Sequence, residues 1–259
     1  MINEHRLREE IIAIGRRMWE RGFVAAADGN ISARLGPDRL LITPSGFGKG
    51  FLSPDQLLRI DMRGVVIPSY HPATRGLKPS SETMMHLEAY SRRPDVHAVI
   101  HAHPPLSIAL TVAGLPLDAD VLPEVIYSVG IIPTAPYVTP GTPDGSHAVR
   151  ELVKVHDAIL LDHHGTLTVG ANLTEAYMRL ERIEHSAAIL LAARQVGELK
   201  RLPKAEFEKL CALGVCARQI GLHSAASEEI AAGPGPQAPT TTVRQAGRLP
   251  PAEPGTPYA

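Results

Sequence analysis

Two histidines, His101 and His103, lie two residues apart at the end of the apolar run 96–104. Because alternate side chains of a β-strand share a face, both imidazoles can point toward one place. Neutral imidazoles that converge are typical ligands of a divalent metal, and zinc is the metal they favour most. A strand histidine can also serve only as a hydrogen-bonding residue of the fold. The pair therefore indicates a candidate zinc site at the mouth of a buried strand.

A third histidine ligand is available at a turn later in the chain. Residues 158–161 and 166–169 are runs with strand character, separated by His163, His164 and Gly165. This pattern predicts two strands joined by a tight turn. We expect His164, beside the glycine, to be the third ligand, with His163 on the other face. Three histidines leave one coordination position open, as catalytic zinc sites require.

The elements that must position these residues follow from the hydrophobic periodicity. Residues 6–21, 80–90 and 174–196 have helical spacing, with Trp19 expected in the core and Thr174 as an N-cap. Short apolar runs between Gly, Pro and Asp predict strands at these further places: around Ile31, 40–42, 65–67 and 130–133. Strands mixed with helices in this order predict an α/β fold, a single-domain α/β/α sandwich with a central sheet.

The composition favours one domain followed by a tail. The chain has 259 residues, of which 44% are hydrophobic, enough for one substantial core. Residues 1–223 are expected to form the domain. Residues 224–259 are rich in Pro, Ala and Gly, and their large aliphatic residues are few: Ile230, Val243 and Leu249. Such a segment buries too little apolar surface to offset its ordering entropy, so we expect it to be disordered.

The charge distribution excludes several classes of partner. A net charge of −1, with acidic and basic residues dispersed, provides no basic field for nucleic acid. No apolar stretch reaches the roughly 18 to 20 residues of a membrane-spanning helix, and the first ten residues are charged, so we expect a cytoplasmic protein with no membrane partner. Cys211 and Cys216 lack CxxC spacing, so neither a thiolate metal site nor a disulfide is expected.

Three loops carry hydroxyl or amide groups suited to an anion: residues 28–32, 43–46 and 80–82. The last opens a helix, whose free N–H groups and positive dipole end can hold a phosphate without many cationic residues. The alternative is ordinary turn and capping chemistry, with Ser80 as the helix cap. Residues 46–50 superficially resemble a nucleotide-binding loop, but they lack its GxxxxGK[ST] spacing, so nucleotide binding is rejected.

Taken together, these motifs resemble the class II aldolase/adducin family, in particular its L-fuculose-phosphate aldolase type. The similarity extends over about residues 5–215, in the family's order. It rests on these elements: Gly29-Asn30, Thr43-Pro44-Ser45-Gly46, Ser80-Ser81-Glu82, His101-Ala102-His103 and His164-Gly165. The resemblance implies a mostly antiparallel central sheet and a homotetramer with active sites between subunits.

The resemblance also implies a role for each matched residue. The substrate phosphate would be bound by Asn30, Ser45, Gly46, Ser80 and Ser81. One zinc ion per chain would be bound by His101, His103 and His164, with Glu82 as the catalytic carboxylate and a further ligand. Tyr127 matches a tyrosine that reaches in from the neighbouring subunit and acts as an acid.

The function implied is reversible cleavage of a ketose 1-phosphate to dihydroxyacetone phosphate and an aldehyde, with Glu82 exchanging the C3 proton of dihydroxyacetone phosphate. Dehydratases and decarboxylases of the family keep the same zinc and glutamate, so both remain alternatives. The family's sugar-phosphate 4-epimerases carry Asp where Glu82 stands, which counts against them. A non-catalytic module like the adducin head is not expected to keep the zinc histidines.

Overall fold

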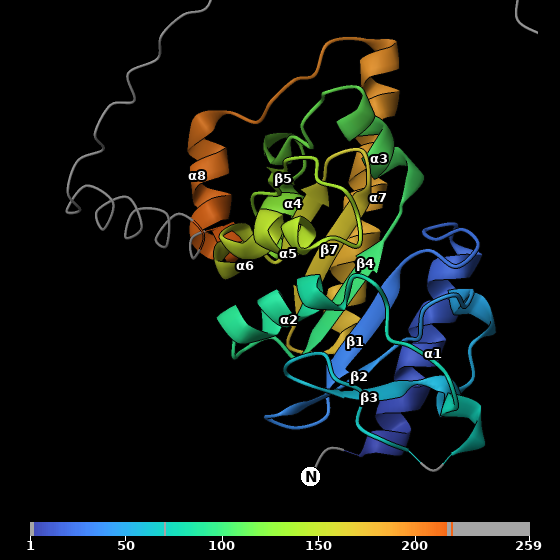
Figure 1. Ribbon diagram of the computed structural model, residues 1–259. Helices are drawn as coiled ribbons and strands as arrows, with labels where there is room; N and C mark the ends of the chain where they lie inside the picture. Colours follow the sequence, from blue (N-terminus) through green and yellow to red (C-terminus); the bar gives the residue numbers. More distant parts are fainter. Residues whose placement is uncertain (1–2, 70, 217–218, 220–259) are drawn as a thin grey trace, which may run out of the picture.

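The computed structural model describes residues 3–69, 71–216 and 219 (Figure 1). Its centre is a seven-stranded sheet with the strand order β3-β2-β1-β4-β7-β6-β5. Neighbouring strands are antiparallel, except for β5 and β6, which are parallel. The expected tail, residues 224–259, lies outside the described residues.

The strands are β1 (Asn30–Arg34), β2 (Arg39–Ile42), β3 (Leu58–Asp61), β4 (Ala98–Ala102), β5 (Thr134–Ala135), β6 (Ala158–Leu161) and β7 (Gly165–Gly170). The α-helices are α1 (Glu4–Glu20), α2 (Thr83–Arg92), α3 (Pro105–Val112), α4 (Pro123–Ser128), α5 (Pro143–Arg150), α6 (Leu152–Val155), α7 (Leu173–Val196) and α8 (Lys204–Leu213). Short 3₁₀ helices are η1 (Lys49–Phe51), η2 (Pro54–Gln56), η3 (Pro72–Thr74) and η4 (Ala119–Val121).

Helices cover both faces of the sheet, as Figure 1 shows. One face packs against α2, α5 and α6 through a buried cluster that includes Val99 of β4. The other face packs against α1, α7 and α3 through clusters that include Ile100 of β4. Successive residues of β4 thus enter opposite layers, as the pleat of a buried strand requires. The prediction of an α/β sandwich with a mostly antiparallel sheet is confirmed.

Several local predictions were wrong in detail. The strand predicted at 65–67 is displaced: β3 lies at Leu58–Asp61, and of residues 65–67 only Val66 forms an isolated bridge, to Ile60. The later strand predicted at 130–133 begins at Thr134. The cap of α7 is Asn172, whose side chain accepts a hydrogen bond from the Glu175 amide.

Trp19 was expected in the core, but it is 45% exposed and packs edge-on against Phe51, with ring centroids 5.0 Å apart. The prediction that the two cysteines stay unpaired was also wrong. Cys211 and Cys216 form a disulfide, because the bend at Gly214, where α8 ends, brings their Cα atoms within 4.6 Å of each other. Among the helices of the described residues, none has the length and apolarity needed to cross a membrane.

The start of α3, just beyond His103, is held by a buried carboxylate of α7. Glu184 accepts hydrogen bonds from the backbone N–H groups of Leu106 (2.9 Å) and Ser107 (2.9 Å) and from the Ser107 hydroxyl (2.7 Å). These groups would otherwise be unsatisfied donors at a helix N-terminus. Glu184 therefore fixes the direction in which the chain leaves β4.

Replacing Glu184 with Ala should lower the free energy of unfolding by about 2 to 4 kcal/mol, because three donors lose a charged acceptor. Urea denaturation measures this change. The control is Glu181→Ala on the same helix, which removes an ion pair to Arg21 at 40% side-chain exposure and should cost less than about 1 kcal/mol. Equal losses in the two variants would contradict the capping role.

Candidate functional site

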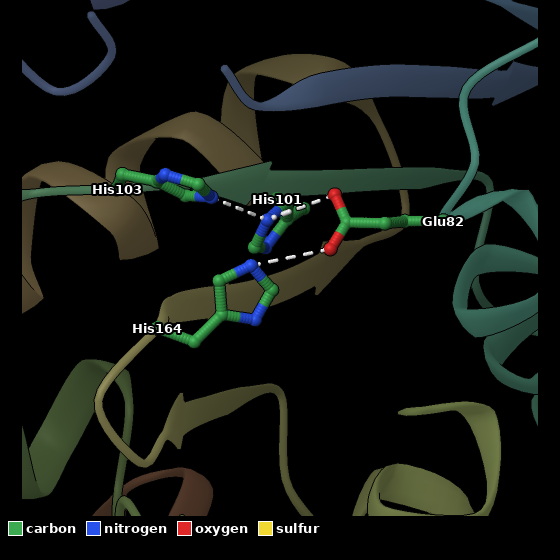
Figure 2. A group of neighbouring side chains, drawn as sticks. All are labelled: Glu82, His101, His103 and His164. Atoms are coloured by element: carbon green, nitrogen blue, oxygen red, sulfur yellow. Dashed lines mark hydrogen bonds and ion pairs between the residues drawn. The ribbon is translucent and has the colours of Figure 1, made fainter. Parts of the chain in front are cut away.

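Four side chains converge near the end of β4, as Figure 2 shows. One ligand atom from each of Glu82, His101, His103 and His164 lies within 4.8 Å of the others. The Nε2 atoms of His101 and His103 are 2.9 Å apart. The two oxygens of Glu82 lie 3.2 Å from Nε2 of His101 and 3.2 Å from Nε2 of His164. The structure therefore brings together every residue expected from the sequence to bind metal.

Strand pairing accounts for this convergence. His101 shares a face of β4 with Val99, toward α2, and β4 pairs with β7 so that Ala102 lies opposite Thr166. The turn between β6 and β7 then places His164 beside the end of β4. His163, in the same turn, lies outside the cluster, with its Nδ1 atom 2.9 Å from Asp162.

Gly165 allows the close approach of β7 to this strand end. A Cβ at this position would overlap the carbonyl oxygen of Ala102 and lie 3.0 Å from Cδ2 of His103. No side chain fits there without moving the strand end. The glycine beside His164 is therefore part of what holds two of the imidazoles together.

Neighbouring groups aim the imidazole lone pairs at the centre of the cluster. Nδ1 of His101 lies 2.9 Å from the carbonyl oxygen of Thr166, which can only accept, so Nδ1 is the donor and Nε2 faces the cluster. Nδ1 of His103 lies 3.5 Å from the Asp28 carboxylate, with the same consequence. Such outer contacts orient histidine ligands in metal sites.

Lone pairs and a carboxylate that converge in a buried space repel one another unless a cation lies among them. Three imidazoles and one carboxylate, without a thiolate, are a donor set that suits zinc. Burial lowers the pKa of His103 to about 3, and the nearby His101 adds to this shift, so its ring stays neutral as a ligand must. Burial raises the pKa of Glu82, but its contacts with the His101 and His164 rings outweigh burial and hold the pKa well below its ordinary value, so the carboxylate is ionised.

A buried hydrogen-bonded chain orients Glu82 from the α2 side of the sheet. Nδ2 of Asn30 donates to Oε2 of Glu82 (2.9 Å) and to the Ser80 hydroxyl (2.9 Å). Since a carboxylate accepts only, this fixes the amide orientation and leaves Oδ1 of Asn30 facing Nε2 of His86 at 2.5 Å.

His86 is fully buried, and burial lowers its pKa to about 3, so the ring is neutral. Its Nε2–H therefore donates to Asn30, and its Nδ1 accepts from the Ser32 hydroxyl at 2.6 Å. The Tyr90 hydroxyl lies 2.9 Å from the Ser32 hydroxyl and completes the chain. The hydrogen bonds therefore all run in one direction, from Tyr90 through Ser32, His86 and Asn30 to the carboxylate of Glu82.

The residues expected to bind phosphate surround one cavity of about 220 Å³. Its walls include Asn30, Ser45, Gly46, Ser80 and Ser81, together with Glu82, His103 and His164 of the cluster. The structure thus brings together all five expected residues beside the metal donors.

The helix that was predicted to begin at Ser80, beside this cavity, starts three residues later. α2 begins at Thr83, and Glu82, not Ser80, is its N-cap. The Ser80 hydroxyl accepts from Asn30 and from the backbone N–H of Glu82 (3.3 Å). Ser80 therefore joins its loop to the start of β1, 50 residues away, which is a contact that sequence patterns do not reveal.

Two further features concern the site. Lys49 also lines the 220 Å³ cavity. Its sequence surroundings, the rejected nucleotide-loop pattern, predicted no role for it. Tyr127 does not line this cavity. It lies on α4 at 56% exposure, beside Gly214 at the end of α8.

Replacing His86 with Phe keeps a ring but removes both nitrogens. We expect metal affinity to fall about 10- to 100-fold, because Asn30 no longer holds Glu82 in place. The free energy of unfolding should fall by about 2 to 4 kcal/mol. Competition with a chromogenic chelator measures the affinity. Tyr90→Phe, at the far end of the chain, is the control and should keep the parent affinity. Parent metal affinity in His86→Phe would show that the chain does not orient Glu82.

Comparison with known proteins identifies the relatives of this chain. The family model "Class II Aldolase and Adducin N-terminal domain" matches residues 9–191. A 3-oxo-tetronate 4-phosphate decarboxylase of Cupriavidus necator is 33% identical over 198 residues, 75% of this chain and 88% of the relative. A 5-deoxy-D-ribulose 1-phosphate aldolase of Bacillus thuringiensis serovar kurstaki is 35% identical over 208 residues, 78% of this chain and 92% of the relative.

Solved structures agree. A structure of L-fuculose 1-phosphate aldolase superposes with a TM-score of 0.71 at 28% identity, covering 80% of this chain and 94% of that one. The family match covers more than half of the chain, and the fold and the relatives are consistent with it. The chain belongs to the class II aldolase and adducin family.

Proposed function

We propose that this protein is a zinc-dependent aldolase that reversibly cleaves a ketose 1-phosphate to dihydroxyacetone phosphate and an aldehyde. The observation that carries the proposal is that three residues, Glu82, His103 and His164, belong both to the metal-donor cluster and to the lining of the hydroxyl-rich cavity. A substrate whose phosphate lies in the cavity would present its reacting carbons to the cluster. A sugar phosphate that is chelated through neighbouring oxygens suits such a site.

The proposed roles follow from the contacts of each residue. A divalent metal bound by the three histidines would supply Lewis-acid stabilisation of the negative charge that develops when the carbon–carbon bond breaks. Glu82 would remove the C3 proton of dihydroxyacetone phosphate in the condensation direction and return it in cleavage. Asn30, which donates to Glu82 and to Ser80, would hold this base beside the phosphate-binding loop.

A decarboxylase is the second candidate, because the Cupriavidus necator relative carries that name at 33% identity. Loss of carbon dioxide from a 3-oxo acid phosphate also leaves charge beside a carbonyl, so the same donors could stabilise it. The two reactions differ in the bond that breaks and in the product released.

Product identification separates the two reactions. The metal-loaded protein is incubated with dihydroxyacetone phosphate and a panel of short aldehydes, and in parallel with a 3-oxo-tetronate 4-phosphate. We expect a new ketose 1-phosphate in the first incubation and no carbon dioxide in the second. Carbon dioxide release without any aldol product would replace the aldolase proposal with the decarboxylase.

The two histidines of the β6–β7 turn provide a matched pair for the metal site. His164→Ala should lose bound metal, measured by elemental analysis of purified protein, and all turnover. His163→Ala should keep about one metal ion per chain, because His163 is 53% exposed and lies outside the cluster. Full metal content in His164→Ala, or loss in both variants, would contradict the assignment.

We further propose a cytoplasmic homotetramer, with Tyr127 acting in a neighbouring subunit's site. Tyr127 is 56% exposed on α4 and does not line the cavity of its own chain, which is consistent with this placement. In the condensation direction its hydroxyl would donate a proton to the aldehyde oxygen. The substrate, a small sugar phosphate, requires neither nucleic acid nor membrane.

Tetramers assembled from two different variants test whether Tyr127 acts in the site of the neighbouring subunit. His101→Ala and Tyr127→Phe should each be inactive, since each removes one half of every site. Mixed by unfolding and reassembly in equal amounts, they should recover about a quarter of parent activity, because a site between unlike chains can combine both intact halves. No recovery, from mixtures that do form tetramers, would show that Tyr127 acts within its own chain or not at all.

A further inference from the structure

Lys49 is a buried lysine at the start of η1. Only 1% of the residue is exposed. Its backbone packs closely under α1, where a Cβ on Gly15 would lie 2.8 Å from the Lys49 carbonyl oxygen. The ammonium group donates to the carbonyl oxygens of Ala27 (2.9 Å) and Phe47 (2.5 Å). An ammonium has three N–H donors, so these two acceptors leave one donor for a further partner.

The charge of this lysine has no counter-ion within the described residues. The nearest acidic groups, Asp28 and Glu82, act on Lys49 at a distance and do not form an ion pair with it. Both are engaged elsewhere: Asp28 with His103 at 3.5 Å, and Glu82 with His101 and His164. Burial lowers the pKa of Lys49 to about 8, so the group remains largely cationic at neutral pH. A buried cation without a paired anion is costly and is usually compensated by a ligand.

The surroundings of Lys49 indicate what that ligand is. Lys49 lines the 220 Å³ cavity together with Asn30, Ser45, Gly46, Ser80 and Ser81. Hydroxyl and amide groups around a cation form a site for an anion with several acceptor oxygens, such as a phosphate. His103 lines the same cavity, so the cation lies beside the metal cluster as well.

We propose that Lys49 supplies the positive charge that holds the phosphate group of the substrate in this cavity. The inference rests on the proposed function and deepens it. It adds one cation to the hydroxyl and backbone N–H groups that the sequence led us to expect around the phosphate. The third N–H of the ammonium donates to a phosphate oxygen, while its two bonds to Ala27 and Phe47 keep the group in place.

Lys49 could instead serve only to fasten the loops at Ala27 and Phe47 to each other. The two roles differ in what the side chain does to anion affinity. If Lys49 only holds the two loops together, its replacement lowers the free energy of unfolding. If it binds the anion, its replacement weakens phosphate binding and raises the KM for the phosphorylated substrate, while kcat stays largely unchanged.

The experiment titrates inorganic phosphate into the full-length, metal-loaded protein by calorimetry. Three proteins are compared: the parent, Lys49→Met and Lys154→Met. Lys154 carries the same charge on α6, is paired with Glu151 and does not line the cavity. We expect Lys49→Met to bind phosphate at least about 10-fold more weakly than the parent, and Lys154→Met to bind like the parent. The KM for the ketose 1-phosphate should rise by a similar factor in Lys49→Met alone.

Parent affinity in a folded Lys49→Met would overturn the inference and leave the aldolase proposal standing. A parent protein that binds no phosphate would overturn both the inference and the proposed phosphorylated substrate. If Lys49→Met does not fold, a crystal structure of the parent protein with bound phosphate shows whether Lys49 contacts the anion. An oxygen of the anion within about 3 Å of the Lys49 nitrogen supports the inference, and a phosphate held only by hydroxyls and backbone N–H groups overturns it.

Discussion

The register of β4 between β1 and β7 is the constraint on which the candidate site depends. In the pairing with β1, Asn30 lies opposite His101, and in the pairing with β7, Ala102 lies opposite Thr166. A slip of one residue would turn His101 toward α1 and α7 and would separate Asn30 from Glu82. The apolar residues that alternate along β4 secure this register, because Val99 and Ile100 belong to different buried clusters. The packing of the core thus determines which side chains meet at the candidate site.

Charge balance joins the two halves of the site. The donor cluster gathers lone pairs and one carboxylate and needs a cation, whereas the adjoining cavity contains a buried ammonium and needs an anion. Asn30 lies between them and donates one N–H to each side, to Glu82 and to Ser80. A phosphorylated, metal-chelating sugar would satisfy both requirements at once. This complementarity is the physical reason for preferring a sugar-phosphate enzyme over a binding module.

The sequence was sufficient where local patterns decide the outcome. The apolar strand before His101 and the turn at His163 to Gly165 both follow from residue types within a few positions, and the structure has them at these places. The helices predicted from periodicity at 6–21, 80–90 and 174–196 correspond to α1, α2 and α7.

Long-range contacts account for what was missed. Ser80 was expected to cap its own helix, but its hydroxyl accepts a hydrogen bond from Asn30 of β1. Lys49 is buried because α1 packs over its backbone at Gly15, and Trp19 is displaced to the surface, where it packs edge-on against Phe51. For Lys49 and Trp19, tertiary packing overrides the ordinary preference of the residue type for surface or core.

The central claim is that Glu82 is the base beside a metal-binding cluster, and solvent-deuterium exchange into dihydroxyacetone phosphate tests it without any aldehyde. Glu82→Gln keeps the size and polarity of the side chain but cannot take a proton. Exchange by the metal-loaded variant should fall by about 100-fold or more. Glu88→Gln on the same helix, which removes a carboxylate paired with Arg150, should exchange at the parent rate. A folded, metal-loaded Glu82→Gln that exchanges as fast as the parent would contradict the account.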